Sequence, residues 1–226
     1  MKPFLQSVKS SKIKVLVLAV CLGAVPQLAL AEANESVSSP RAEQWKIVPT
    51  LGYSYFNIQG ASAAYKSKSG SSAAVLAQMP MMGGQIELES GLEYLETGAK
   101  QTLDFGFFSI DAMTIDIKQI AVPLRAKYIF NPETTSTRWY GKAGLTPTYV
   151  VGAKAEVPGA SSDIKSDLND IGVLTQVGLG ADWGIDAVTG RVSLDLTYSY
   201  GLTKVFKNSD GRATGFQVQA GYAFAL

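Results

Sequence analysis

Residues 215–226 read GFQVQAGYAFAL. Alternate positions are apolar and mostly bulky, and the positions between them are small or carry an amide. The apolar set consists of Phe216, Val218, Ala220, Tyr222, Phe224 and Leu226. A period of two is typical of a β-strand whose two faces meet different surroundings. The segment therefore predicts a strand with one broad oily face and a second face that suits a crowded interior.

The same period continues from Trp45 onward, and no stretch has a convincing helical period. Eight runs show it: residues 46–58, 73–81, 85–97, 115–130, 138–152, 171–184, 190–202 and 214–226. The second run, AAVLAQMPM, fits either phase. Short connections follow the even-numbered runs, whereas longer ones such as GASAAYKSKSGSS and PGASSDIKSD follow the odd-numbered runs. Short turns at one rim, long loops at the other and both termini beside the short turns are typical of bacterial outer-membrane barrels.

Charged residues within the runs share the less bulky face. They are Glu87, Glu89, Glu93, Arg125, Lys127, Lys142, Asp182, Arg191 and Asp195. The other face carries bulky apolar residues, as Leu194, Leu196 and Tyr198 do in the seventh run. A charge that faces lipid at mid-depth costs about 2–4 kcal/mol. In a membrane barrel the charged set must therefore point into the lumen, and its shared phase allows this.

Three architectures compete for this pattern: a sandwich, a soluble ligand-binding barrel and a membrane barrel. A soluble barrel would show water a face rich in Lys and Glu, but here that face is rich in Gly, Ala, Ser and Gln. Aromatic residues also gather near the ends of the runs, as they do at membrane interfaces. We therefore predict an all-β fold, an eight-stranded antiparallel up-and-down transmembrane β-barrel. Its closure leaves no unpaired strand edge in lipid.

The N-terminus resembles an export signal, with four lysines, the apolar run VLVLAVCLGAV and the cleavage site Ala29-Leu30-Ala31. A transmembrane anchor is the alternative, but the run is shorter than the roughly 20 residues that a helical span needs. We expect a signal peptide over residues 1–31, a flexible lead-in over 32–44 and the barrel over 45–226. Cys21, the only cysteine, lies in the signal; a lipid attached there is the alternative to removal.

Composition excludes several functions. Removal of the signal leaves 16 basic and 19 acidic residues, so no nucleic-acid partner is expected. The chain has no histidine, which excludes Ser-His hydrolysis and most zinc sites. We predict no enzyme activity, no catalytic residue, no cofactor and no metal.

Parts of several runs resemble the PorT-like family of small outer-membrane β-barrel domains over about residues 45–226. The residues that carry this resemblance are 91–94, 97–100, 120–130, Gly178, Gly180, Leu194, Leu196, Tyr198 and 201–203. The resemblance implies a bacterial outer-membrane location and a barrel fold. The last residues, Gln219, Gly221, Phe224 and Leu226, resemble the signal that the barrel-assembly machinery recognises. The expected partners are therefore outer-membrane lipid and that machinery, with the barrel itself a monomer.

The lumen charges allow two interpretations. If the hairpin of the third and fourth runs folds about Phe107, Glu87 lies opposite Lys127 and Glu89 lies opposite Arg125, with a two-residue slip as the alternative. The charges could line a path for ions or polar solutes, or they could plug the lumen. An eight-stranded barrel is only wide enough to be filled by its own side chains, and paired charges spare one another desolvation. We favour the plug.

The outer loops suggest the function. Phe105, Phe107 and Phe108 could grip an apolar ligand, or they could simply pack the tip of their own loop. We expect a non-enzymatic protein with a structural or surface-interaction role, although the sequence does not identify the extracellular partner. The alternative is a barrel that carries or passes small apolar molecules or ions, and a soluble secreted lipid-binding barrel is a weaker third possibility.

Overall fold

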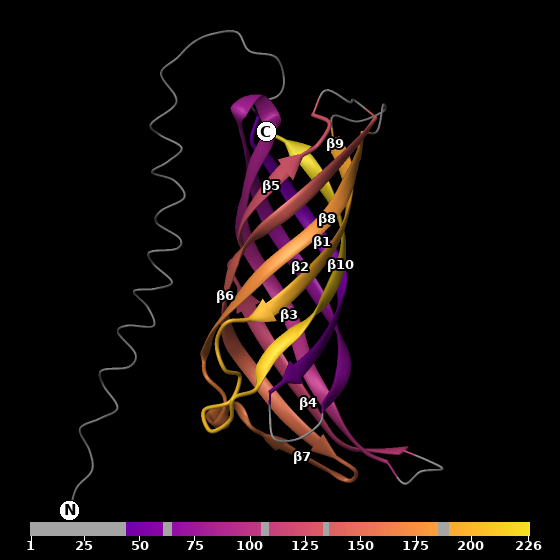
Figure 1. Ribbon diagram of the computed structural model, residues 1–226, viewed down its shortest axis with the longest axis vertical. Coiled ribbons are helices and arrows are strands. Elements are labelled where there is room, and N and C mark those ends of the chain that lie inside the picture. Colours follow the sequence, from indigo (N-terminus) through magenta and orange to yellow (C-terminus); the bar gives the residue numbers. More distant parts are fainter. Residues whose placement is uncertain (1–43, 61–64, 105–108, 133–135, 185–189) are drawn as a thin grey trace, which may run out of the picture. The chain divides into compact units, whose positions relative to one another are not determined.

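The computed structural model describes residues 44–60, 65–104, 109–132, 136–184 and 190–226, which form a barrel of antiparallel strands (Figure 1). The predicted signal peptide, nearly all of the lead-in and residues 105–108 lie outside the described residues. The elements are β1 (Lys46–Gln59), β2 (Tyr65–Met81), η2 (Met82–Gly84), β3 (Ile86–Asp104), β4 (Ser109–Ala121), β5 (Leu124–Ile129), β6 (Thr137–Val157), β7 (Ala160–Asp163), η3 (Lys165–Asp167), β8 (Ile171–Gly184), β9 (Gly190–Gly201) and β10 (Arg212–Ala225). Among the described residues, no helix is long and apolar enough to cross a membrane.

The sheet closes on itself. Its strands follow the order β2-β1-β10-β9-β8-β6-β4-β3, and β2 also pairs with β3. β4 and β5 form two halves of one wall segment, because both pair with β3 and with β6. β7 pairs with β6 alone and adds no segment to the ring. The predicted eight-stranded antiparallel barrel is confirmed.

The two rims differ as the connection lengths predicted. At one rim Lys46 at the start of β1 lies opposite Ala225 at the end of β10. The tight turn at η2, where Gly83 has a φ of 67°, lies at this same rim, and β7 lies at the opposite one (Figure 1). The long hairpins therefore gather at the β7 rim, which we call the outer rim.

Strand bounds differ from the predicted runs mainly toward the outer rim. β8 has the predicted bounds, but β2 begins at Tyr65 instead of residue 73, and β3 and β6 run on to Asp104 and Val157. The segment GASAAYKSKSGSS has the composition of a loop, yet from Tyr65 onward its backbone continues the ladder, with Tyr65 opposite Gln101 beyond a bulge. Backbone pairing does not need apolar side chains, so composition made these three strands too short toward the outer rim.

The predicted fourth strand is interrupted at Val122 and Pro123. Proline supplies no backbone N–H, so strands tolerate it best at ends and bulges. Here β4 ends at Ala121 and β5 begins at Leu124. Val122, which the alternation places outward, is buried, and its N–H donates to the carbonyl of Pro147 over 2.9 Å. Pro123 and Pro147 thus lie at the same break in the regular pairing of the strands.

The outer wall is apolar along the middle of the barrel. Exposed side chains include Leu51, Val75, Leu92, Leu145, Val177, Leu179, Leu194, Leu196 and Val218. In β2, whose phase the sequence left open, Val75 faces out, whereas Ser72 and Gln78 are buried. Exposed aromatic residues occur toward both rims, for example Trp139 and Trp183 beside the short turns and Tyr53 and Tyr198 toward the outer rim. This distribution is that of a wall that faces hydrocarbon between two interfaces.

Candidate functional site

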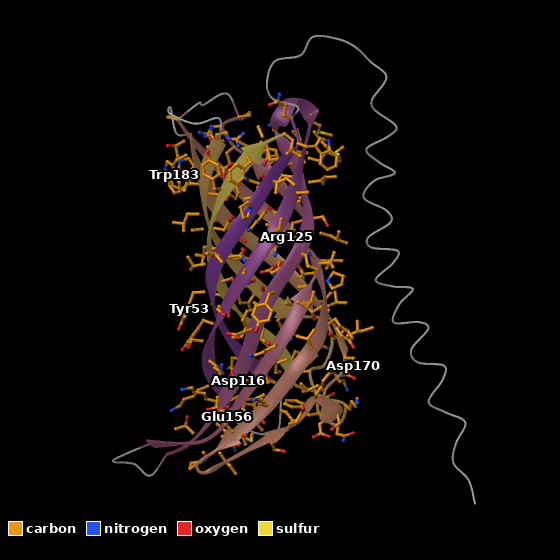
Figure 2. The ribbon with its side chains drawn as sticks, turned by 180° about the vertical axis from the view of Figure 1, so that it is seen from behind. Tyr53, Asp116, Arg125, Glu156, Asp170 and Trp183 are labelled. Atoms are coloured by element: carbon orange, nitrogen blue, oxygen red, sulfur yellow. The ribbon has the colours of Figure 1, made fainter. Side chains whose placement is uncertain are left out.

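The lumen contains the charges that the alternation placed there. Eight of the nine predicted residues are buried, and none of these eight exposes more than 7% of its surface: Glu87, Glu89, Glu93, Arg125, Lys127, Lys142, Asp182 and Asp195. The ninth, Arg191, is half-buried, and it donates to the backbone carbonyl of Asp182 over 3.0 Å. In Figure 2 Arg125 lies between Trp183, toward the rim of short turns, and Tyr53, toward the outer rim.

Arg125 on β5 is the centre of the network. Its Nη1 donates to Glu89 over 3.0 Å, its Nη2 donates to Glu93 over 2.8 Å, and its Nε donates to Gln176 over 2.8 Å. The first two contacts reach the neighbouring strand β3, and the third crosses to β8. Because a guanidinium has several donors in a fixed plane, one side chain can hold two carboxylates and an amide at once.

Glu93 carries the network to the far wall. Its carboxylate is fully buried, and besides Arg125 it accepts hydrogen bonds from Gln217 over 2.8 Å and from Gln219 over 3.0 Å. Both glutamines belong to β10. Gln176 in turn donates to Gln217 over 3.2 Å. A continuous chain of hydrogen bonds therefore spans the lumen from β3 to β10 and β8.

A second cluster lies nearer the rim of short turns. Lys127 contacts Asp182 at 3.0 Å and Glu87 at 3.4 Å. Arg138 contacts the same two carboxylates, at 2.9 Å and 3.7 Å respectively, and Lys46 forms an ion pair with Glu87. The eight buried charges include three cations and five carboxylates, so Lys46 and Arg138 are the cations that bring this core to neutrality.

Tyr140 connects this cluster to the ion pair between Lys142 and Asp195. Lys142 contacts Asp195 at 2.9 Å, and the Tyr140 hydroxyl donates to the same carboxylate over 2.7 Å. The Nζ of Lys127 lies 3.7 Å from the centre of the Tyr140 ring, a cation–π contact. Tyr140 is thus a buried aromatic residue in contact with both a cation and a carboxylate.

The predicted register of the third and fourth strands is confirmed. Glu87 lies opposite Lys127, and Glu89 lies opposite Arg125. Sequence reasoning missed Lys46, Arg138, Tyr140 and the glutamine partners of Glu93. Alternation places all of them on the inner face. Arg138 meets Asp182 on the neighbouring strand β8. Their other carboxylate partners, Glu87, Asp195 and Glu93, lie on strands that are not neighbours in sequence, so only closure of the barrel brings them together.

Gly180 makes room for Tyr140. A Cβ atom at Gly180 would lie 2.5 Å from the tyrosine ring and hydroxyl. We expect Gly180→Ala to lower the free energy of unfolding by about 1–3 kcal/mol, because the ring must move away from its ionic partners. Urea titration of the folded barrel in phospholipid vesicles would measure this. Gly152→Ala is the matched control, since a Cβ there meets nothing within 4 Å; equal stabilities of the two variants would contradict the prediction.

An apolar cluster fills the outer end of the lumen, and the segments around Leu168 and Phe206 cover it like a lid. Buried Ile58, Ile115, Ile117 and Val150 pack below Leu168, which is itself fully buried. Leu168 forms an isolated bridge with Phe206, and the Asn169 side chain donates to the carbonyls of residues 204 and 206. The segments before β8 and after β9, which extend two neighbouring strands, are therefore joined at the outer end of the barrel. Sequence reasoning treated both segments only as surface loops.

The residues of the predicted assembly signal divide between the two faces. Gln219 is buried in the lumen, whereas Phe224 and Leu226 are exposed on the outer wall. A Cβ at Gly221 would lie 2.7 Å from the Thr50 side chain, so this position is tightly packed. The residues of the predicted apolar loop contact, Phe105, Phe107 and Phe108, lie outside the described residues.

These features define a class of protein: a transmembrane β-barrel with an apolar wall, closed edges and its charges inside. The sequence pattern of the family described as "Outer membrane protein beta-barrel domain" matches residues 33–207. The chain belongs to this family. The protein is therefore a porin-like barrel of a Gram-negative outer membrane, and the soluble secreted alternative is wrong.

Solved structures of small outer-membrane barrels resemble this fold. Neisserial surface protein A is 14% identical, covers 80% of this chain and 97% of its own, and gives a TM-score of 0.51. OprG from Pseudomonas aeruginosa is 12% identical, with 81% and 96% covered and a TM-score of 0.48. The attachment invasion locus protein Ail of Yersinia pestis is 14% identical, with 80% and 99% covered and a TM-score of 0.43. A comparison with curated protein sequences finds no significant match.

Proposed function

We propose that the protein is a sealed, non-enzymatic outer-membrane barrel with a structural or surface-interaction role. The observation that carries this proposal is the network of buried ion pairs across the lumen. Arg125 and Glu93 connect β3, β5, β8 and β10 through hydrogen bonds of 2.8 to 3.0 Å. An ion that entered would have to displace partners that already satisfy one another, and removal of a partner from a buried pair is costly.

The lid supports the same function. The cavity beneath it, lined by Ile117, Val150, Leu174 and Val205 among others, has a volume of about 30 Å³. That is room for roughly one water molecule. A small apolar molecule does not fit in a cavity of this size, which supports the sealed barrel over the carrier.

The outer rim offers a defined surface for contact with other molecules. Asn169 holds the two outer segments together, and the N–H of Lys207 donates to the carbonyl of Asp167 over 3.0 Å. Lys204 and Asp210 form an ion pair on the exposed side. Segments that are ordered before binding lose less conformational entropy when a partner arrives.

Further parts of this proposal rest on sequence alone. Gln219, Gly221, Phe224 and Leu226 are proposed as the segment that the barrel-assembly machinery reads, and the barrel is proposed to act as a monomer. Membership of the narrower PorT-like group also stays a prediction, based on the resemblance of the strand that contains Arg125.

Planar-bilayer recording of the purified, folded protein tests the sealed lumen. We expect no sustained conductance from the wild-type barrel or from Lys204→Gln, a control that alters an exposed charge outside the lumen. Sustained wild-type conductance that is lost in Arg125→Ala would overturn the proposal, because the network would then line a path. The mobility of unboiled protein on a gel shows that each preparation is folded.

A further inference from the structure

An apolar groove crosses the outer wall over β10, β1, β2, β3 and β4, with a volume of about 780 Å³. Its length follows one row of cross-strand neighbours, in which each residue lies opposite the next: Ala220, Leu51, Ala73, Tyr94 and Ile120. The groove thus runs continuously across five strands. It belongs to the wall that faces lipid and is separate from the charged lumen.

Small side chains give the groove its depth. Ala73 and Ala220 alternate with the larger Leu51 and Tyr94 along the row. A second row, in which Val75 lies opposite both Pro49 and Leu92, forms the other side. A trough of this kind, lined mostly by aliphatic side chains with Tyr94 and Tyr222 beside them, matches the polarity of a single acyl chain.

One end of the groove has a polar edge. Lys118 lies two residues before Ile120 on β4 and therefore shares its outer face. Lys118 lies opposite Glu96, whose carboxylate accepts hydrogen bonds from the Ser71 hydroxyl over 2.8 Å and from the Tyr94 hydroxyl over 2.9 Å. Lys118 itself is 3.9 Å from Glu96 and exposes 57% of its side chain. Its ammonium is available to a further anion.

Lysines and carboxylates both lie beyond this edge. Asp116 forms an ion pair with Lys68 and lies opposite the exposed Lys154. Figure 2 places Asp116 on the outer-rim side of Tyr53, and Glu156 still closer to that rim. The Lys118 end of the groove therefore points toward the outer interface of the membrane, where lipid headgroups lie.

We propose that this groove binds one acyl chain of an outer-leaflet lipid and that Lys118 holds the anionic phosphate of its headgroup. The two contacts are matched, because the apolar row ends at Ile120 and the exposed Lys118 follows on the same face of β4. The site goes beyond the sealed-barrel function and does not depend on it, since the two lie on opposite faces of the wall.

Native mass spectrometry of the folded barrel in detergent, titrated with saturated phosphatidylglycerol, tests the site. We expect Lys118→Gln to weaken the apparent Kd about fivefold, the effect of one lysine near an anionic lipid. Ala73→Leu, which fills the trough, should weaken binding by at least as much. The matched controls are Lys204→Gln, a similarly exposed lysine elsewhere, and Ala126→Leu, an exposed alanine on β5 outside the groove.

Diacylglycerol with the same chains separates the two contacts, because it lacks the phosphate. Ala73→Leu should weaken its binding, whereas Lys118→Gln should leave it unchanged. The proposal is overturned if either variant binds phosphatidylglycerol as its control does, or if wild-type protein binds both lipids equally. Gel mobility of unboiled samples confirms that all four variants are folded.

Discussion

Replacement of Arg125 with methionine lowers the free energy of unfolding by about 3–5 kcal/mol, the cost of removing one partner from a buried ion pair. Arg125 exposes 1% of its side chain, and Glu89 and Glu93 expose 4% and 0%. Methionine fills similar space but donates nothing, so two carboxylates lose their guanidinium partner, and the Gln176 amide oxygen keeps the Thr146 hydroxyl. Urea titration in phospholipid vesicles, followed by tryptophan fluorescence, gives the free energy.

The neighbouring Leu124→Met is the matched control, because Leu124 faces out and its change should cost well under 1.5 kcal/mol. The double variant Arg125→Met with Glu93→Gln tests the pairing itself. It should recover part of the loss, since a neutral amide tolerates burial better than a lone carboxylate. A cost below about 1 kcal/mol for Arg125→Met would show that the network is solvated, contrary to the burial described above.

The register of the ionic network was predictable because two simple rules agree. Period two places Glu87, Glu89, Arg125 and Lys127 on one face, and folding about a central residue sets which of them meet. Pro123 interrupts the strand but adds no residue to it, so the register continues through the break unchanged. Local pattern was therefore sufficient for contacts between adjacent strands.

Contacts across the lumen were not predictable in this way. Arg138 on β6 contacts Glu87 on β3, and Gln219 on β10 contacts Glu93 on β3. These pairs depend on the curvature of the closed sheet, which alternation does not encode. Leu168 illustrates the same limit, because it follows the polar stretch PGASSDIKSD and is buried with side chains of β1, β4 and β6.

Replacement of Leu196 with arginine tests which face meets lipid. Leu196 exposes 52% of its surface, and it lies midway along β9, opposite Leu179 and Val218. At the bilayer midplane an arginine on the lipid face costs about 2–4 kcal/mol. Leu202 exposes a similar 46%, but it follows the end of β9 at the outer rim. Leu202→Arg should cost only about 0–1 kcal/mol, as charges near the interface do.

The two arginine variants can be compared directly because both leucines are already exposed. In a soluble barrel an arginine at either position would be hydrated, and both changes would fall within about 0.5 kcal/mol of neutral. A difference of about 2 kcal/mol between the two variants, measured by urea titration in vesicles, therefore reports depth in the bilayer. If Leu196→Arg were as stable as Leu202→Arg, the apolar wall would not face hydrocarbon, and the lumen charges would lose their physical reason for pointing inward.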